Sequence, residues 1–231
     1  MKRFYKDVTI VAEEGGFAIR LDGRPVRTPA RALLALPTPA LADAVAQEWR
    51  AQGETVDPGS MPCTGLANAA IDHIVPNRES FAADIARYAQ SDLLCYRADG
   101  PDTLVARQAA AWGPLLDWAR ARYDVTFAVT QGILPVPQPD ETIARLSAAV
   151  AACDPFVLAG LSTLVTLSGS LVCGLAVVAG GHDIDAVWQA AEIDEAWQVE
   201  QWGEDDEAIA RSARRAADFS IAGAFCAMSR A

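Results

Sequence analysis

The longest apolar stretch of the chain runs from Pro155 to Gly181 and contains no charged residue. A charge-free run of more than about 18 residues raises the possibility of a membrane span. However, Ser168-Gly169-Ser170 interrupts the run near its middle, and no basic cluster flanks it to set an orientation in a membrane. The pattern therefore favours two short helices that form a buried hairpin, because a helix that is apolar on all sides is usually surrounded by other helices.

The next segment, residues 183–207, reverses this pattern because it is rich in Asp and Glu and has no Lys or Arg. Asp183 is a suitable N-cap for a helix. Apolar side chains then recur at helical spacing at Ile184, Val187, Trp188, Ala191, Val199 and Trp202. On the same helical wheel, Glu195 falls near the centre of the apolar stripe and Asp194 at its edge.

An acidic side chain inside an apolar stripe must find a partner, stay partly hydrated or have its pKa raised. Glu195 is therefore a candidate functional residue. The alternative is structural: Arg211, Arg214 or Arg215 of the last predicted helix closes an internal ion pair with this acid.

The N-terminal part predicts β-hairpins followed by a helix. Two short runs, 4–11 and 17–21, are predicted as strands, because apolar and polar residues tend to alternate along them. A turn that contains glycine separates the two runs. The helix begins after the N-cap Thr38 and ends before Gly53. Its apolar stripe ends in Trp49, for which we favour packing in the core over contact with another protein.

From about residue 77 onward the pattern is helical throughout. A helix over 104–123 is expected to break or kink at Gly113-Pro114, because proline removes a backbone donor. The predicted fold class is thus α+β. A small N-terminal α+β domain (1–80) with β-hairpins precedes an all-helical C-terminal domain (81–231) built around the buried apolar hairpin.

Composition excludes several functions. The formal charge of −11 argues against nucleic acid and against anionic lipid, since both need a basic surface. It is compatible with a basic partner, a cationic ligand or simple solubility. The five cysteines are scattered, which suits reduced, buried thiols, and the N-terminus lacks the apolar core of a secretory signal. We therefore expect a cytoplasmic protein without membrane insertion.

Signatures of catalysis or of a bound cofactor are mostly missing from the sequence. There is no glycine-rich phosphate loop and no GxSxG motif, and the only histidines, His73 and His182, lack the spacing of metal ligands. We expect no catalytic residue, metal or cofactor. A competing interpretation is a small-molecule-binding protein or hydrolase with an acidic cleft, formed by Asp72, His73 and the acidic helix.

Six motifs, taken in order and with their spacing, resemble a known family. They are RFYKDV near the start, LDGRPVRTPA at 21–30, EWRAQGETVDP at 48–58, MPCTGLANAAID at 61–72, DLLCYRA at 92–98 and WQVEQWGEDDEA at 197–208. The family is that of the assembly chaperones for the F1 sector of ATP synthase, shared by mitochondria and α-proteobacteria. The resemblance covers nearly the whole chain.

The resemblance implies a non-enzymatic protein. It would bind the free F1 α subunit and prevent its aggregation until it pairs with the β subunit. The protein would be a monomer when free of client. It would be located in the cytoplasm of a bacterium, whereas its eukaryotic relatives would be located in the mitochondrial matrix.

The resemblance also carries residue roles. The family's functionally sensitive tryptophan falls on Trp49, and its important acid falls on either Asp194 or Glu195. We expect the client-binding surface to contain Asp194, Glu195, Trp197, Gln198, Trp202 and Glu204.

Overall fold

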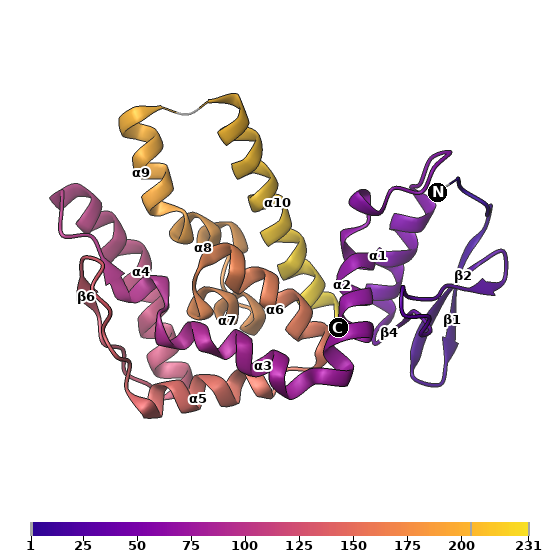
Figure 1. The fold of residues 1–231 in the computed structure, drawn as a ribbon, viewed down its shortest axis with the longest axis horizontal. Coiled ribbons are helices and arrows are strands. Elements are labelled where there is room, and N and C mark those ends of the chain that lie inside the picture. Colours follow the sequence, from indigo (N-terminus) through magenta and orange to yellow (C-terminus); the bar gives the residue numbers. More distant parts are fainter. Residues whose placement is uncertain (1, 204, 231) are drawn as a thin grey trace. The chain divides into compact units, whose positions relative to one another are not determined.

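The structure, a computed structural model, describes residues 2–203 and 205–230. These residues fall into two compact units, whose elements are labelled in Figure 1. The first unit is the chain up to Arg78 with residues 154–160 and the chain from Ile221, and the second is Glu79–Cys153 with Leu161–Ser220. Two short segments of the C-terminal half are thus grouped with the N-terminal residues. The predicted α+β class is confirmed.

Among the described residues of the first unit, four strands form an antiparallel sheet in which β2 pairs with each of the others. The strands are β1 (Val8–Glu13), β2 (Gly16–Leu21), β3 (Arg24–Pro25) and β4 (Ala35–Leu36). The turn between β1 and β2 requires glycine at Gly16, whose φ is +139° and where a Cβ would lie 2.4 Å from the carbonyl oxygen of Leu36. The predicted hairpin is therefore present, with its sharp turn at the predicted place.

Helix α1 (Pro39–Arg50) packs on this sheet. Its predicted cap is confirmed: the Thr38 hydroxyl accepts a hydrogen bond from the Leu41 N–H. Leu41 and Val45 are fully buried. The chain then forms a 3-10 turn (Pro58–Ser60), α2 (Pro62–Ala69), a π-helical turn (Ala70–Ile74) and a second 3-10 turn (Val75–Asn77).

The remaining elements are helical apart from two short strands, β5 and β6, that pair in parallel. They are α3 (Arg78–Ala86), 3-10 turns at Arg87–Gln90 and Leu93–Cys95, β5 (Tyr96–Arg97), α4 (Asp102–Tyr123), β6 (Thr130–Gln131), α5 (Asp140–Ala151), α6 (Pro155–Ser168), α7 (Leu171–Ala179), α8 (Ile184–Ala191), α9 (Ile193–Trp202) and α10 (Asp206–Met228). Helix α4 continues through Pro114, so the break predicted there is wrong.

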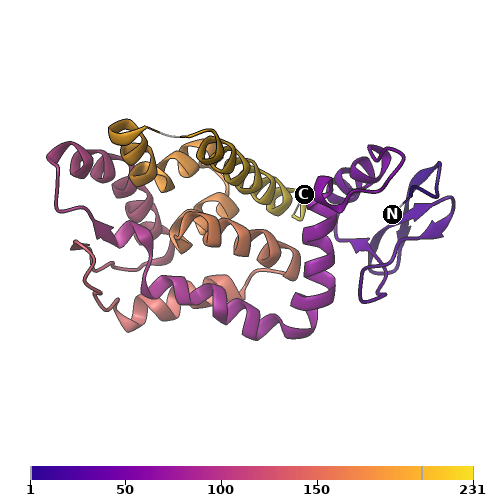
Figure 2. The ribbon, with the colours of Figure 1, turned by 45° about the horizontal axis from the view of Figure 1, so that its top comes forward.

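The charge-free run forms α6 and α7, as the sequence predicts. Gly169, with φ +66°, turns the chain between them, and the Ser170 hydroxyl caps α7 by accepting from the Cys173 N–H. Figures 1 and 2 show α7 enclosed by other helices of the second unit. Gly174 allows close packing, since a Cβ there would lie 2.7 Å from Cγ2 of Val165. Within the described residues, no helix is both long enough and apolar enough to cross a bilayer.

Candidate functional site: helix α9 and the grooves beside it

Helix α9 is a separate helix and not a continuation of α8. Glu192 leaves helical geometry, with φ −95° and ψ 14°, and α9 begins anew at Ile193. It ends at Gly203, whose φ of +78° belongs to the left-handed half of the map. Because the helical phase is interrupted at Glu192, a wheel drawn from residue 184 does not extend to the residues of α9.

This interruption corrects the prediction that Glu195 lies inside an apolar stripe. Every residue of α9 is described, and none is buried. Glu195 is exposed, and Trp202, predicted as part of the stripe, is 78% exposed. Tryptophan is highly buried on average, so an indole as accessible as this one is a candidate contact residue.

The internal ion pair that the sequence allowed is present, with the predicted arginine but a different acid. Arg215 of α10 forms an ion pair with Glu192, with a nitrogen–oxygen distance of 2.9 Å and one hydrogen bond of 3.0 Å. It also donates to the carbonyl oxygen of Leu167 at 3.0 Å. Its guanidinium also lies over the ring of Trp188. Burial raises the pKa of Glu192, the positive charge of Arg215 opposes this rise, and the nearby charge of Glu195 adds to it.

The other predicted acid, Asp194, has a structural contact. It accepts a hydrogen bond of 2.7 Å from the side-chain amide of Gln108, which is itself buried in α4. The Gln108 side-chain oxygen in turn accepts from the Ala98 N–H at 2.8 Å. Asp194 therefore joins α9 to α4 and to the segment after β5, whereas Glu195 makes no such contact.

A second contact between α4 and α9 lies at the surface. Arg107 of α4 pairs with Glu200 at 2.7 Å, and its guanidinium lies 5.0 Å from the centre of the Trp197 ring. Hydrogen bonding to Arg107 lowers the pKa of Glu200. This exposed pair contributes little to stability, but it covers one face of Trp197.

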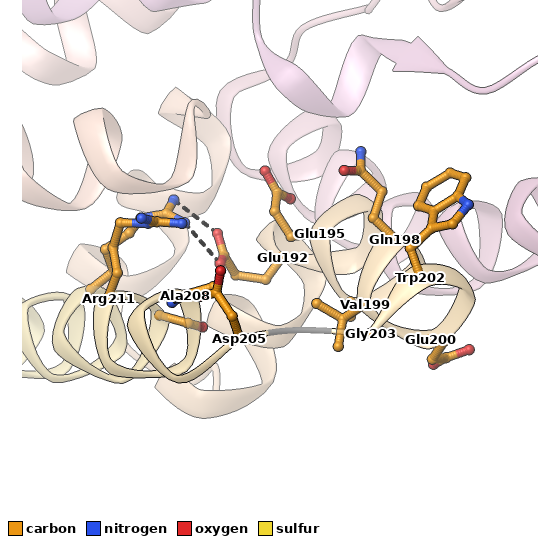
Figure 3. A pocket seen from close by; sticks show the side chains of 13 residues that line it. Glu192, Glu195, Gln198, Val199, Glu200, Trp202, Gly203, Asp205, Ala208 and Arg211 are labelled. Atoms are coloured by element: carbon orange, nitrogen blue, oxygen red, sulfur yellow. Dashed lines mark hydrogen bonds and ion pairs between the residues drawn. The ribbon is translucent and has the colours of Figure 1, made fainter.

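A groove of about 730 Å³ separates α9 from α10 (Figure 3). Glu195, Gln198 and Trp202, at helical spacing i, i+3 and i+7, project toward the same side of α9 in this view. The residues that line the groove include Glu192, Glu195, Ala196, Val199, Trp202 and Arg211. The groove thus combines apolar contact area with four carboxylates and two arginines, and this acidic excess suits a partner that presents an apolar side chain beside a basic one.

Trp49 lies in the first unit and not at this site. Its ring packs edge-on against that of Tyr5, with 5.7 Å between the ring centres. Its carbonyl oxygen accepts a hydrogen bond of 2.7 Å from the Tyr5 hydroxyl. Its indole nitrogen is buried, with no hydrogen-bond partner among the described residues. Glu204, the last member of the predicted surface, lies outside the described residues.

Glu48, next to Trp49, has a structural role that its local sequence does not predict. The carboxylate of Glu48 accepts from the N–H groups of Cys63 and Thr64, at 2.7 and 2.8 Å, and from the Thr64 hydroxyl. It thereby caps the start of α2. The role of Glu48 in the motif at 48–58 is therefore structural.

The acids of the competing enzyme hypothesis are also accounted for structurally. Asp72 accepts from the Thr28 hydroxyl at 2.6 Å and from the Ala30 N–H at 2.9 Å, which holds the loop after β3. Asp72 belongs to the first unit and α9 to the second. Among residues 2–203 and 205–230, no group of three or more His, Cys, Asp and Glu side chains is arranged to hold a metal ion.

Comparisons with known proteins agree with this fold. The family model for the ATP12 chaperone protein matches residues 2–120. The crystal structure of Atp12 from Paracoccus denitrificans superposes with a TM-score of 0.94 at 45% identity, covering 99% of this chain and 98% of that one. The crystal structure of the Atu1473 protein from Agrobacterium tumefaciens superposes with a TM-score of 0.93 at 44% identity, covering 98% of this chain and 85% of that one.

A more distant relative is the mitochondrial protein atp12 of Schizosaccharomyces pombe, which is 24% identical over 217 residues, 87% of this chain and 74% of that protein. The fold and these matches define an ATP synthase assembly chaperone. The chain belongs to the ATP12 chaperone family. The family model ends before α9, whereas the Paracoccus match covers nearly the whole chain.

Proposed function

We propose that the chain binds the free α subunit of the F1 sector and prevents its aggregation until the β subunit takes its place. The observation that carries this proposal is α9, a helix with no buried residue that exposes Trp202 beside acidic side chains. Exposed aromatics of this kind are typical of interface hot spots. The activity is binding alone, without a catalytic step, cofactor or metal, and it takes place in the cytoplasm.

The last of the motifs that carry the family resemblance, 197–208, overlaps α9. The residues of this helix are used differently from those of two other motifs. Asp72 and Glu48 belong to other motifs and hold loops and helix ends of the fold. In α9, Glu195, Gln198 and Trp202 are exposed. Side chains that do not stabilise the fold are available to contact a client.

The two acids of α9 take different roles in this proposal. Glu195 contacts the client, because it is exposed and lines the groove beside α10. Asp194 is a positioning residue, because its carboxylate is engaged by Gln108. Acidic groups in an interface raise the association rate and select basic partners more than they raise affinity, which suits a chaperone that must later release its client.

Charge reversal at Glu195 tests this proposal. Glu195→Lys should lower the rate of association with the α subunit by about tenfold at low salt and weaken suppression of its aggregation, measured by light scattering at equimolar ratio. Asp218→Lys, an equal change of charge at an exposed position of α10, is the matched control. Failure of the wild-type chain to suppress aggregation would refute the proposed function. Equal suppression by both variants would refute only the role of Glu195.

A further inference from the structure

The loop between α4 and α5 is held rigidly at its base. Thr142, which is buried, binds both the N–H and the carbonyl oxygen of Thr126 through its hydroxyl. Gln138, also buried, binds the N–H and the carbonyl oxygen of Ala128 at 3.0 and 2.8 Å. Buried polar side chains that satisfy two backbone groups each fix the conformation of the segment that they hold.

The tip of this loop is apolar and exposed. Ile133 is 94% exposed and Leu134 is 75% exposed. They follow Gly132, whose N–H donates to the Arg97 carbonyl oxygen at 2.8 Å, and they precede Pro135, which restricts the backbone. One exposed aliphatic residue is ordinary, but two adjacent ones on a fixed loop form a preorganised contact surface.

Ile133 faces a groove of about 620 Å³ whose opposite wall belongs to α9. The apolar lining includes residues of the loop, of α4 and of α9, and Pro101 just before α4: Ile133, Leu104, Trp197, Trp202 and Pro101. Trp202 lines this groove as well as the groove beside α10. The two grooves therefore lie on either side of α9 and share its exposed tryptophan.

The charged side chains that line this groove are Asp99, Asp194 and Arg97. Arg97 is engaged within the protein, since its guanidinium donates to the Gln108 carbonyl oxygen at 2.6 Å and lies over the Trp112 ring. Asp99 is exposed. The groove thus presents negative charge beside its apolar wall, and a basic occupant complements it.

We propose that this groove, which we name the Ile133 groove, receives an extended segment of the client in which a bulky apolar side chain stands next to Lys or Arg. This inference rests on the proposed function and adds the chemistry of the segment recognised. A second copy of this chain fits less well, because a protein of net charge −11 would bring further negative charge to an acidic groove.

Truncation of the loop tip tests the groove. The double variant Ile133→Ser, Leu134→Ser should bind the α subunit about tenfold more weakly, with unchanged thermal unfolding, because both side chains are exposed. Ile209→Ser removes an aliphatic side chain that is 50% exposed on α10 and should bind as the wild type does.

The outcomes separate the two proposals. If the wild-type chain binds the α subunit and the double variant binds equally well, the groove proposal is wrong while the proposed function stands. If the wild-type chain binds no α subunit, the proposed function is wrong and the groove proposal falls with it.

An array of overlapping peptides from the α subunit tests the chemistry of the occupant. Peptides that bind the wild-type chain and not the double variant should contain a bulky apolar residue beside Lys or Arg. They should lose binding when that basic residue becomes Glu, and Asp99→Lys should weaken their binding. Peptides without such a pair would contradict the proposal, as would sedimentation in which the wild type is a dimer and the double variant a monomer.

Discussion

Helices α7 and α9 are nearly equal in length, with 9 and 10 residues, yet they use their surfaces in opposite ways. Helix α7 is buried along almost its whole length. Its buried residues are Leu171, Val172, Cys173, Gly174, Leu175, Ala176 and Val178. Helix α9, all of whose residues are described, buries none. The first helix is used for the fold, and the second leaves Glu195, Gln198 and Trp202 exposed.

The two helices are also held in place differently. Helix α7 begins over the carboxylate of Asp92, a fully buried residue, which accepts from the Ser170 hydroxyl at 2.7 Å and from the Val172 N–H at 2.9 Å. Helix α9 is held at its start by the buried Gln108, which donates to Asp194, and at the surface by the weaker pair of Arg107 and Glu200. Substitutions around α7 should therefore change stability, and substitutions on α9 should change binding.

The largest expected effect comes from Asp92→Ala. It leaves the Ser170 hydroxyl and the N–H groups of Val172 and Leu94 without their acceptor in the core. We expect the free energy of unfolding to fall by roughly 3 kcal/mol or more, measured by urea denaturation. Asp92→Asn retains one acceptor oxygen and should lose less. A loss below about 1 kcal/mol for Asp92→Ala would show that α7 does not depend on this cap.

A smaller effect concerns pH. Burial raises the pKa of Asp92 above its usual value of 3.8, and hydrogen bonds from Val172 and Ser170 oppose the rise. Above pH 3.8 the folded state therefore binds more protons at this position than the unfolded state. The contribution of Asp92 to stability is fully present below that pH and is lost as the pH rises through the folded-state pKa.

Asp92→Asn does not titrate, so it isolates this contribution. The free energy of unfolding of the variant, relative to that of the wild type, should increase between about pH 4 and about pH 7. Urea titrations of both proteins across this range measure the difference. A difference that decreases with pH would mean that hydrogen bonding outweighs burial and that Asp92 is stabilised in its charged form.

The sequence predicts the elements whose signals are local. The break at Ser168-Gly169-Ser170 and the caps Thr38 and Asp183 follow from residue types at adjacent positions, and each is found in the structure. The apolar run could be assigned to buried helices because its pattern is continuous over two helix lengths.

Features that depend on distant partners could not be predicted in this way. Glu48 and Asp92 cap helices that begin 14 and 79 residues later, at Pro62 and Leu171, and nothing in their local sequence names those helices. The interruption at Glu192 has no glycine or proline to signal it. Because of that interruption, the predicted place of Glu195 near the centre of an apolar stripe is wrong, and Glu195 is exposed.

The smallest expected effect on stability, and the largest on binding, comes from Trp202→Ser. Because this side chain is 78% exposed, the free energy of unfolding should stay within about 0.5 kcal/mol of the wild-type value. If Trp202 is the aromatic anchor of the client interface, affinity for the α subunit should fall by at least about tenfold.

The dissociation constant of the folded Trp202→Ser variant for the α subunit, measured together with its urea denaturation curve, is therefore the decisive test of α9 as the client-binding helix. We expect unchanged unfolding and weakened binding. Unchanged unfolding with full affinity would contradict the assignment of α9 as the client-binding helix.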